Sequence, residues 1–310
     1  MRKVVITGAT GTIGMALIKK CTESGMGVIV LANPASKRLS RISDDPLVTV
    51  IKCGLSELAG ATPESLGLPG ISAGIFADAM FHLAWEGAFG DARNDKALQD
   101  RNASYALDAV SLAAKLGCTV FVGAGSQAEY GRVSGTLSPD TPCDPENEYG
   151  RAKLAASQTT AKLAKELGIR HIWPRILSIY GPYDGEKTMV MSVITQLLQG
   201  KRPALTAGEQ MWDFLYSDDA ARALLLLAKS GKDGCIYPVG SGMARPLREY
   251  IEIIRDTIDP SLPLGFGEIP YSEKQVMYLC ADIKKLREDT GFSPSVSFEE
   301  GIRKTIDFCS

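Results

Sequence analysis

The segment that most constrains this chain is at its start, where an apolar run turns through three glycines into a helical pattern. Residues 3–15 read KVVITGATGTIGM, and the β-branched residues that open the segment are typical of a buried parallel strand. Gly8, Gly11 and Gly14 then lead into a helix predicted over residues 15–21. Such a turn gathers free backbone N–H groups and the positive end of a helix, and glycine lets a phosphate approach closely. The spacing is GxxGxxG rather than GxGxxG; it also fits an ordinary strand–helix turn, but its position favours a nucleotide site.

Composition excludes several classes of function. The 310 residues suffice for one large α/β unit or two joined lobes, and the net charge of −2 does not favour a nucleic-acid or anionic-membrane surface. No apolar run has the length of a membrane span, and the first residues lack a signal-peptide layout. The seven cysteines are scattered, which predicts reduced thiols in a cytoplasmic protein. With two histidines, a His-based metal site is not expected.

The second strand, expected over Val28–Leu31, bears on the choice of dinucleotide. In such folds an acid after this strand often holds the adenosine ribose hydroxyls. Here no acid occurs before Asp44, and Lys37 and Arg38 follow instead. Two cations suit a 2′-phosphate, so the sequence favours NADP over NAD, the alternative being a solvated basic turn.

Strands and helices continue to alternate, which predicts a parallel sheet whose ligands lie at the carboxyl ends of the strands. Ser126 follows one of these strands and is therefore placed for chemistry. His82 lies in an apolar strand, and we interpret it as a packed core residue rather than a catalytic base. Residues 54–74 are left unassigned. The expected strands are 48–53, 79–84 and 119–122, and the helix between the last two is 95–116.

A tyrosine and a lysine share one face of the next predicted helix, which runs from Tyr149 to Leu167. Tyr149 and Lys153 are four residues apart. An ammonium near a phenol stabilises the phenolate, so the pKa of Tyr149 is expected to fall below its usual value of about 10. Such a tyrosine can donate and accept a proton near neutral pH. A surface pair on a helix is the plainer interpretation of the spacing alone.

Taken together, the motifs resemble those of the extended short-chain dehydrogenase/reductases, the nucleotide-sugar epimerase/dehydratase family. The resemblance covers nearly the whole chain, and the motifs come in the family's order. After the glycine turn they are HLAW (82–85), GSQAEYG (125–131), YGRAK (149–153), RILSIYGP (175–182) and DFLYSDD (213–219).

The resemblance implies a Rossmann-type doubly wound parallel sheet, expected over residues 1–174 and about 205–240. It also implies a smaller C-terminal lobe for a nucleoside-diphosphate sugar, expected over about 175–204 and 241–310. By resemblance, Tyr149 is the acid/base, Lys153 holds the nicotinamide ribose and lowers the tyrosine pKa, and Ser126 binds the reacting oxygen. Implied contacts to the cofactor come from Gly8, Thr10, Gly11, Thr12, Ile13, Gly14, Asn33, Lys37, Arg38, Leu83, Ala84, Tyr149 and Lys153.

Several positions depart from the family pattern. The 4,6-dehydratases carry an Asp-Glu pair after the catalytic Ser/Thr, but this chain has Gln127 and Ala128, so no 4,6-dehydratase activity is expected. Many epimerases keep Asn where Ser178 stands and Arg where Trp212 stands, and relatives often have Asp at the position of Gly54. These departures concern how the substrate and the adenosine are held rather than the redox chemistry.

The C-terminal part supplies the expected substrate contacts. Residues 264–271 contain Gly and Pro and are expected to wrap the substrate. A homodimer through the helices 95–116 and 151–167 is expected by resemblance. Candidate substrate contacts are Trp85, Gln127, Ser178, Trp212 and Arg245, with Lys274 and Gln275 as further candidates. The remaining predictions are helices over 189–199, 217–228, 247–258, 282–290 and 298–308, and a strand over 236–239.

The sequence leaves three kinds of function open. A 4-ketoreductase would use NADPH to reduce a 4-keto-6-deoxy sugar, with or without 3,5-epimerisation, and the departures favour this function. A 4-epimerase would hold NAD tightly and return the hydride to the other face. A non-catalytic NADP-binding sensor is the third, although such a protein would not need Ser126, Tyr149 and Lys153 together.

Overall fold

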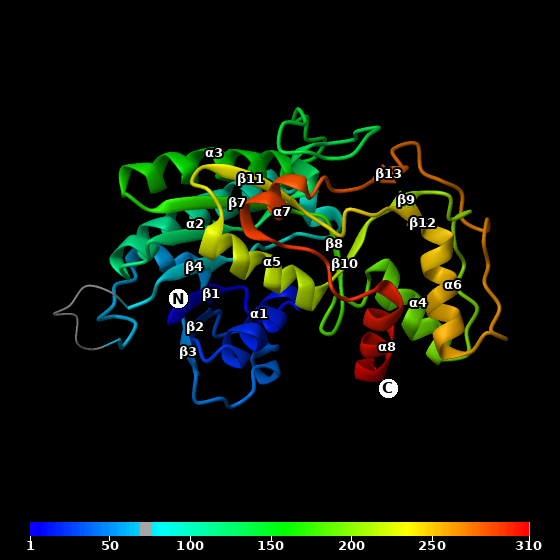
Figure 1. Ribbon diagram of the computed structural model, residues 1–310, viewed down its shortest axis with the longest axis horizontal. Helices are drawn as coiled ribbons and strands as arrows, with labels where there is room; N and C mark the ends of the chain where they lie inside the picture. The colour runs from blue at the N-terminus through cyan, green and yellow to red at the C-terminus, as the bar shows by residue number, and fades with distance from the viewer. Residues whose placement is uncertain (69–75, 310) are drawn as a thin grey trace.

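A parallel sheet forms the centre of the molecule (Figure 1). The computed structural model describes residues 1–68 and 76–309. All pairs in the sheet are parallel, which confirms the predicted Rossmann-type α/β class. The order is β11 (Cys235–Val239), β7 (Arg170–Ile176), β5 (Val120–Gly123), β4 (Ala79–His82), β1 (Lys3–Thr7), β2 (Gly27–Ala32) and β3 (Val48–Lys52), with β6 (Gly125–Ser126) paired to the end of β7.

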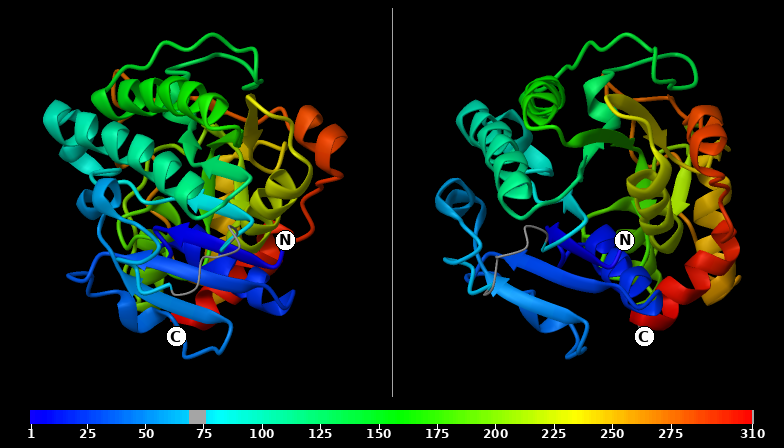
Figure 2. Two further views of the ribbon diagram at one scale, coloured as in Figure 1. Left: turned by 90° about the vertical axis from the view of Figure 1, so that its left-hand side faces the viewer. Right: turned by 60° about the vertical axis from the view of Figure 1, so that its left-hand side comes forward.

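Helices cover both faces of this sheet, so its central strands are apolar on both sides. Val4 and Ile6 of β1 face α1 (Thr12–Glu23) and α5 (Ser217–Ser230). Val5 faces the opposite side, where α2 (Lys96–Lys115) lies with α3 (Glu148–Glu166) beside it. Figure 2 shows the two helix pairs on opposite sides of the sheet.

The strand order reverses next to β1. The chain runs outward from β1 through β2 to β3, and then returns to place β4 on the other side of β1. A parallel sheet opens a crevice at such a point, outside the carboxyl ends of its strands. The glycine turn after β1 and the residues after β4 meet there.

A smaller lobe lies beside that crevice. Its helices share one core in which aromatic rings from four segments stack edge to face or tilted, with centroids 4.5–6.0 Å apart, among them Tyr180, Phe214, Tyr250 and Phe298. Its elements are β8 (Ser178–Tyr180), α4 (Met189–Leu198), β9 (Met211–Trp212), β10 (Phe214–Tyr216), β12 (Arg245–Pro246), α6 (Leu247–Ile258), β13 (Tyr278–Leu279) and α8 (Phe298–Cys309). The remaining helix, α7 (Lys284–Thr290), packs on α5 and β11.

The predicted helices and strands are present, with ends shifted by a few residues at most, but the central strand β7 was not predicted. Its sequence, RHIWPRI, contains two arginines, a histidine and a proline, which argue against a central strand. In the structure, Pro174 lies beyond the pairing of β5 with Arg170–Ile172 and stands opposite Tyr237 of the edge strand β11. Of the unassigned residues 54–74, Leu55–Gly60 form a 3₁₀ helix, η2, and residues 69–74 lie outside the described part. In the described ranges, no helix is both long and apolar enough to cross a bilayer.

Candidate active site

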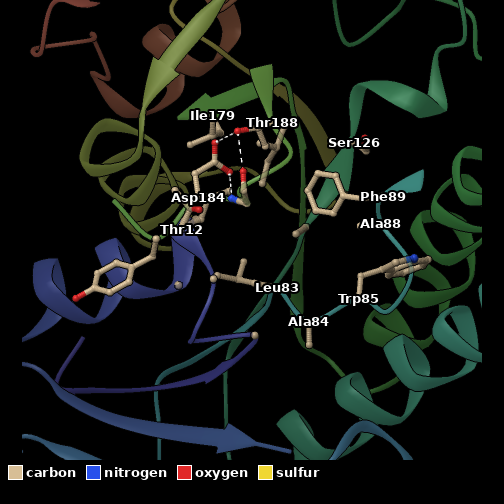
Figure 3. Close-up of a pocket in the computed structure, with 18 of the residues that line it drawn as sticks. Thr12, Leu83, Ala84, Trp85, Ala88, Phe89, Ser126, Ile179, Asp184 and Thr188 are labelled. Atoms are coloured by element: carbon tan, nitrogen blue, oxygen red, sulfur yellow. Dashed lines mark hydrogen bonds between the residues drawn. The ribbon is translucent and has the colours of Figure 1, made fainter. Parts of the chain in front are cut away.

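A cavity of about 1150 Å³ lies between the carboxyl edge of the sheet and the lobe. Single-ligand pockets occupy roughly 300–1,000 Å³, so this cavity has room for more than one ligand. We call the part around residues 7–14 and 31–38 the glycine-turn end, and the part around Ser178, Gln210, Trp212 and Gln275 the lobe end. Figure 3 shows Thr12 and Asp184 at the former, with Ser126 and Trp85 on the other side of the cavity.

The glycine turn has the geometry of a phosphate cradle. Gly8 has a φ of +73°, and a Cβ there would come within 2.6 Å of the backbone of Leu83 and Ala84. A Cβ on Gly11 would instead meet nothing closer than 3.6 Å and would project into the cavity that Gly11 lines. Because the protein itself leaves that space open at the start of α1, these residues fit a dinucleotide whose phosphates approach the backbone.

Most of the predicted cofactor residues line the cavity, and the two exceptions are Lys153, which is buried, and Lys37. The side chain of Lys37 is exposed and does not line the cavity, whereas Arg38 does. Sequence reasoning missed an apolar wall of the cavity, made by Cys53 at the end of the expected strand 48–53 and by Leu55 and Leu58 in the unassigned segment. The other predicted residues that line the cavity are Gly8, Thr10, Gly11, Thr12, Ile13, Gly14, Asn33, Leu83, Ala84 and Tyr149.

Ser126 is the last residue of β6, and the buried carboxylate of Glu129 holds its backbone in place. Its Oγ accepts a hydrogen bond from the N–H of Ala128 at 3.2 Å. Glu129, fully buried, accepts from the Ser126 N–H at 2.8 Å, from Trp173 Nε1 at 3.0 Å and from Arg175 Nε at 2.7 Å. A buried charge needs such partners, and here they hold the Ser126 backbone in place. Sequence reasoning assigned no role to Glu129.

Tyr149 is brought to Ser126 by the start of α3. Asn147 caps this helix by accepting from the Gly150 N–H at 2.8 Å. A Cβ on Gly150 would clash with the carbonyl oxygen of Ala128, so glycine allows the helix to approach the turn that follows Ser126. Burial raises the pKa of Tyr149, and a hydrogen bond with Ser126 and the charge of Arg93 oppose that rise. The expected fall in this pKa is therefore wrong.

The reason lies in where Lys153 points. Its Nζ is buried, donates to the carbonyl oxygen of Ala124 at 2.6 Å and lies 3.7 Å from the centre of the Trp85 ring. The distance from Nζ to the centre of the Tyr149 ring is longer, 5.8 Å. Burial lowers the pKa of Lys153 to about 7, and the carboxylate of Glu129 limits the fall.

Two amides from α2 hold the loop that carries Trp85. Gln99 accepts from Trp85 Nε1 at 2.7 Å and donates to the carbonyl oxygens of Gly87 and Ala92. Asn102 accepts from the Glu86 N–H and donates to the Glu86 carbonyl oxygen, both at 2.9 Å. Both amides are buried. Sequence reasoning missed Gln99 and Asn102, although polar residues on the apolar face of a predicted helix are a signal that could have found them.

His82 is confirmed as a core residue. The residue is 3% exposed, its Nδ1 shares a hydrogen bond of 2.9 Å with Thr7 Oγ1, and its ring stacks on Phe121. Burial lowers the pKa of His82 to about 3, so the imidazole is neutral near pH 7.

At the lobe end, the two residues that depart from the family pattern contact each other. The indole Nε1 of Trp212 donates to Ser178 Oγ at 2.8 Å, and both residues line the cavity with Gln127 and Gln275. The two departures are thus one feature. The indole N–H of Trp212 is therefore already paired within the protein.

Three candidates for substrate contact lie elsewhere. Arg245 does not line the cavity, because its Nη1 pairs with Glu299 Oε1 at 2.9 Å. Lys274 lies outside the lining, although its neighbour Gln275 is part of it. Residues 264–271 do not wrap the cavity either, since Leu264 and Phe266 pack on the core of the lobe.

Comparisons with known proteins identify the family of the chain. Residues 4–240 match the NAD dependent epimerase/dehydratase family. The chain belongs to this family. The resemblance to extended short-chain dehydrogenase/reductases, which are enzymes, is thereby confirmed.

Relatives within the family differ in the reactions that their names state. The dTDP-glucose 4,6-dehydratase of Shigella flexneri is 29% identical over 175 residues, which are 53% of this chain and 47% of that protein, so the match spans about half of its length. The CDP-abequose synthase of Salmonella typhimurium is 25% identical over 98% of this chain and 97% of its own.

Solved structures show the same fold over the whole chain. A UDP-N-acetylglucosamine 4-epimerase from Methanobrevibacter ruminantium M1 superposes with a TM-score of 0.87 at 22% identity, covering 99% of this chain and 98% of that one. A dTDP-glucose 4,6-dehydratase from Streptomyces venezuelae, solved with NAD, gives 0.83 at 22% identity, covering 99% and 96%. This epimerase/dehydratase family member therefore shares its fold with proteins named for both reactions.

Proposed function

We propose that this protein is an NADP(H)-dependent reductase of the 4-keto group of a nucleoside-diphosphate 6-deoxyhexose. The observation that carries the proposal is the cavity wall around Ser126. It offers two hydroxyls for proton transfer, Ser126 and Tyr149, but the next residue, Gln127, is neutral. Elimination of water would need an acid and a base beside the sugar.

Neither of the two carboxylates that line the described cavity directly follows Ser126 in the sequence. Asp184 accepts from the Thr188 hydroxyl at 2.9 Å and from the Gly185 N–H at 2.7 Å, at the glycine-turn end. Glu86 is exposed. A dehydratase reaction is therefore not part of the proposal.

In the proposed reaction the protein supplies the proton and the orientation. A reduced nicotinamide, when bound, supplies the hydride. Tyr149 gives its proton to the ketone oxygen as that oxygen becomes a hydroxyl, and the Ser126 hydroxyl donates a hydrogen bond to the same oxygen. Lys153, whose Nζ donates to the Ala124 carbonyl oxygen, is the residue that the family resemblance implies would hold the nicotinamide ribose.

Apolar side chains near Ser126 favour a deoxy sugar. Trp85, Ala88 and Phe89 line the cavity, and Figure 3 shows them on the Ser126 side. Phe89 is 72% exposed, which leaves a large apolar surface for a ligand to cover. A methyl group at C6 would bury against such a surface, whereas a hydroxyl would lose its hydrogen bonds to water.

The preference for NADP(H) is supported by the end of β2. Asn33, Ser36 and Arg38 line the cavity, and none of them is an acid. A guanidinium and hydroxyl or amide donors suit a 2′-phosphate, which a carboxylate at this point would repel.

The test measures the loss of reduced nicotinamide by its absorbance, with NADPH and NADH separately, on a panel of nucleoside-diphosphate 4-keto-6-deoxyhexoses. Stoichiometric consumption of NADPH supports the reductase. Interconversion of a UDP-hexose without added cofactor, together with no loss of NADPH, would instead identify a 4-epimerase. Tyr149→Phe is the control, because it should abolish turnover and leave cofactor binding intact, while a sensor would lose nothing.

We also propose a homodimer. Helices α2 and α3 lie side by side on one face of the sheet, where the corresponding helices of a second copy would complete a four-helix bundle (Figure 2). Light scattering of the purified protein tests this directly.

A further inference from the structure

Arg93 is a cation in the cavity that no motif pointed to. It lies in the 3₁₀ helix η3 (Gly90–Asn94), just before α2, and lines the cavity. Its Nε is buried and has no hydrogen-bond acceptor among the described residues. Its guanidinium carbon lies 4.8 Å from the centre of the Tyr149 ring. An arginine with an unpaired buried nitrogen over an aromatic ring in a ligand cavity calls for a functional explanation.

The position of Arg93 is built into the fold. Gln99 and Asn102 hold the preceding loop at Trp85, Glu86, Gly87 and Ala92 through the hydrogen bonds described above. The bond from Gln99 to the Ala92 carbonyl oxygen, 2.8 Å, lies directly next to Arg93. Asp95 then caps α2 by accepting from the Leu98 N–H at 3.0 Å. The backbone on both sides of Arg93 is thus fixed.

Lys153 is less well placed to act on the tyrosine ring. Its Nζ is 5.8 Å from the ring centre, against 4.8 Å for the Arg93 carbon, and it faces Trp85 and the Ala124 carbonyl. A guanidinium also stays protonated at every pH at which the protein is folded, whereas a buried ammonium can lose its proton. The lasting positive charge nearest the ring is therefore that of Arg93.

We propose that Arg93 acts through Tyr149, holding a positive charge over the face of its ring so that the phenol can release and regain its proton during turnover. The proposal rests on the proposed function only in that Tyr149 is the proton donor. Arg93 is thus a positioning residue, and it need not touch the substrate.

Groups on four elements face Tyr149. Ser126 on β6 and Arg93 on η3 lower its pKa, Glu129 on the 3₁₀ helix η4 (Gln127–Glu129) raises it, and Lys153 lies on the same helix as Tyr149. Removing the charge of Arg93 leaves burial and Glu129 acting against Ser126 alone. The pKa of Tyr149 should then rise further, by about one pH unit or more for a charge at this distance.

The first experiment needs no substrate. The phenolate of Tyr149 is titrated by its ultraviolet absorbance, with and without NADP⁺, as the difference between each protein and the same protein carrying Tyr149→Phe. Arg93→Gln should raise the midpoint by about one pH unit or more. Arg93→Lys keeps a positive charge and should therefore raise the midpoint by less. Arg151→Gln is the matched control, since Arg151 is two residues from Tyr149 but pairs with Glu148 at the surface.

The second experiment reads the same change in turnover. Reduction needs the protonated phenol, and the reverse oxidation needs the phenolate. In Arg93→Gln, the pH above which reduction is lost and the pH above which oxidation appears should therefore rise together. At a pH below the midpoint, oxidation should slow about tenfold for each pH unit by which the midpoint rises. A titration midpoint unchanged in both Arg93→Gln and Arg93→Lys would overturn the proposal. A raised KM with an unchanged pH dependence of both reactions would also overturn the proposal, because it would mean that Arg93 binds substrate. Because the titration requires no turnover, it separates this inference from the choice of reaction.

Discussion

The glycine-turn end of the cavity is built around a glycine-rich turn of the backbone, whereas the lobe end is built from side chains. At the glycine-turn end, consecutive residues line the cavity, and Gly8 and Gly11 present backbone without a side chain. At the lobe end, side chains from separate segments meet, as Ser178 and Trp212 do across 34 residues. A site made of backbone can be specified by a short motif, while a site made of side chains depends on the whole fold.

The two ends of the cavity also differ in the charge of the side chains that line them. Arg38 lines the glycine-turn end, while the lobe end presents Ser178, Gln210, Trp212 and Gln275, all of them neutral. A site that binds a phosphate through backbone N–H groups and a helix end needs few side-chain cations. At the lobe end, hydrogen bonds and ring surfaces are what the described residues offer to a substrate.

The largest expected effect is on folding, at the glycine turn. Gly8→Ala would place a methyl group 2.5 Å from the Ala84 nitrogen in a backbone conformation with φ of +73°. Strain and overlap together should lower the free energy of unfolding by about 3 kcal/mol or more. Gly25→Ala is the matched control, because Gly25 has a φ of +69° with nothing within 4 Å, and it should cost about 1 kcal/mol. Equal losses in urea unfolding would show that the close approach does not matter.

The next effect separates cofactor binding from folding. Gly11 has an extended backbone, with φ of −86°, and open space in place of a Cβ. Gly11→Val should therefore change the free energy of unfolding by less than about 0.5 kcal/mol, yet weaken dinucleotide binding about a hundredfold by filling the phosphate cradle. Fluorescence titration with NADPH measures the affinity. Unchanged affinity would mean that the phosphates do not lie against Gly11.

Much of the glycine-turn end could be predicted from the sequence, as could the pairing of Tyr149 with Lys153, because both signals are local. Gly8, Gly11 and Gly14 stand on one turn, and Tyr149 and Lys153 on one helix. The direction in which Lys153 points was not local information. It depends on Trp85, which in turn depends on Gln99, and this chain of contacts exists only in the folded protein.

The same reasoning explains what was missed around Ser126. Glu129 pairs with Arg175, 46 residues away. Arg175 lies on β7, which was not predicted as a strand because it contains a proline and charged residues. Each residue looks exposed and solvated when considered alone. Together they form a buried pair whose register only the sheet provides.

A moderate effect is expected on the choice of dinucleotide. Arg38→Ala removes the cation that lines the glycine-turn end without touching the backbone cradle. It should lower kcat/KM for NADPH about tenfold and leave that for NADH nearly unchanged, since a charge-assisted contact to the 2′-phosphate is lost. Lys37→Ala, at an exposed neighbour outside the cavity, is the control and should change neither value. An equal fall with both cofactors would count against NADP(H) specificity.

The smallest effect concerns the lobe end. Trp212→Phe keeps most of the ring surface but removes the indole N–H that donates to Ser178 Oγ at 2.8 Å. The free energy of unfolding should fall by about 1 kcal/mol, and substrate KM should rise while NADPH affinity stays constant. Combined with Ser178→Ala in a double-mutant cycle, the pair should show a coupling energy of about 0.5–1.5 kcal/mol. If the two changes are additive, or if NADPH binding weakens as much as substrate binding, then the two ends of the cavity are not the separate sites that their construction indicates.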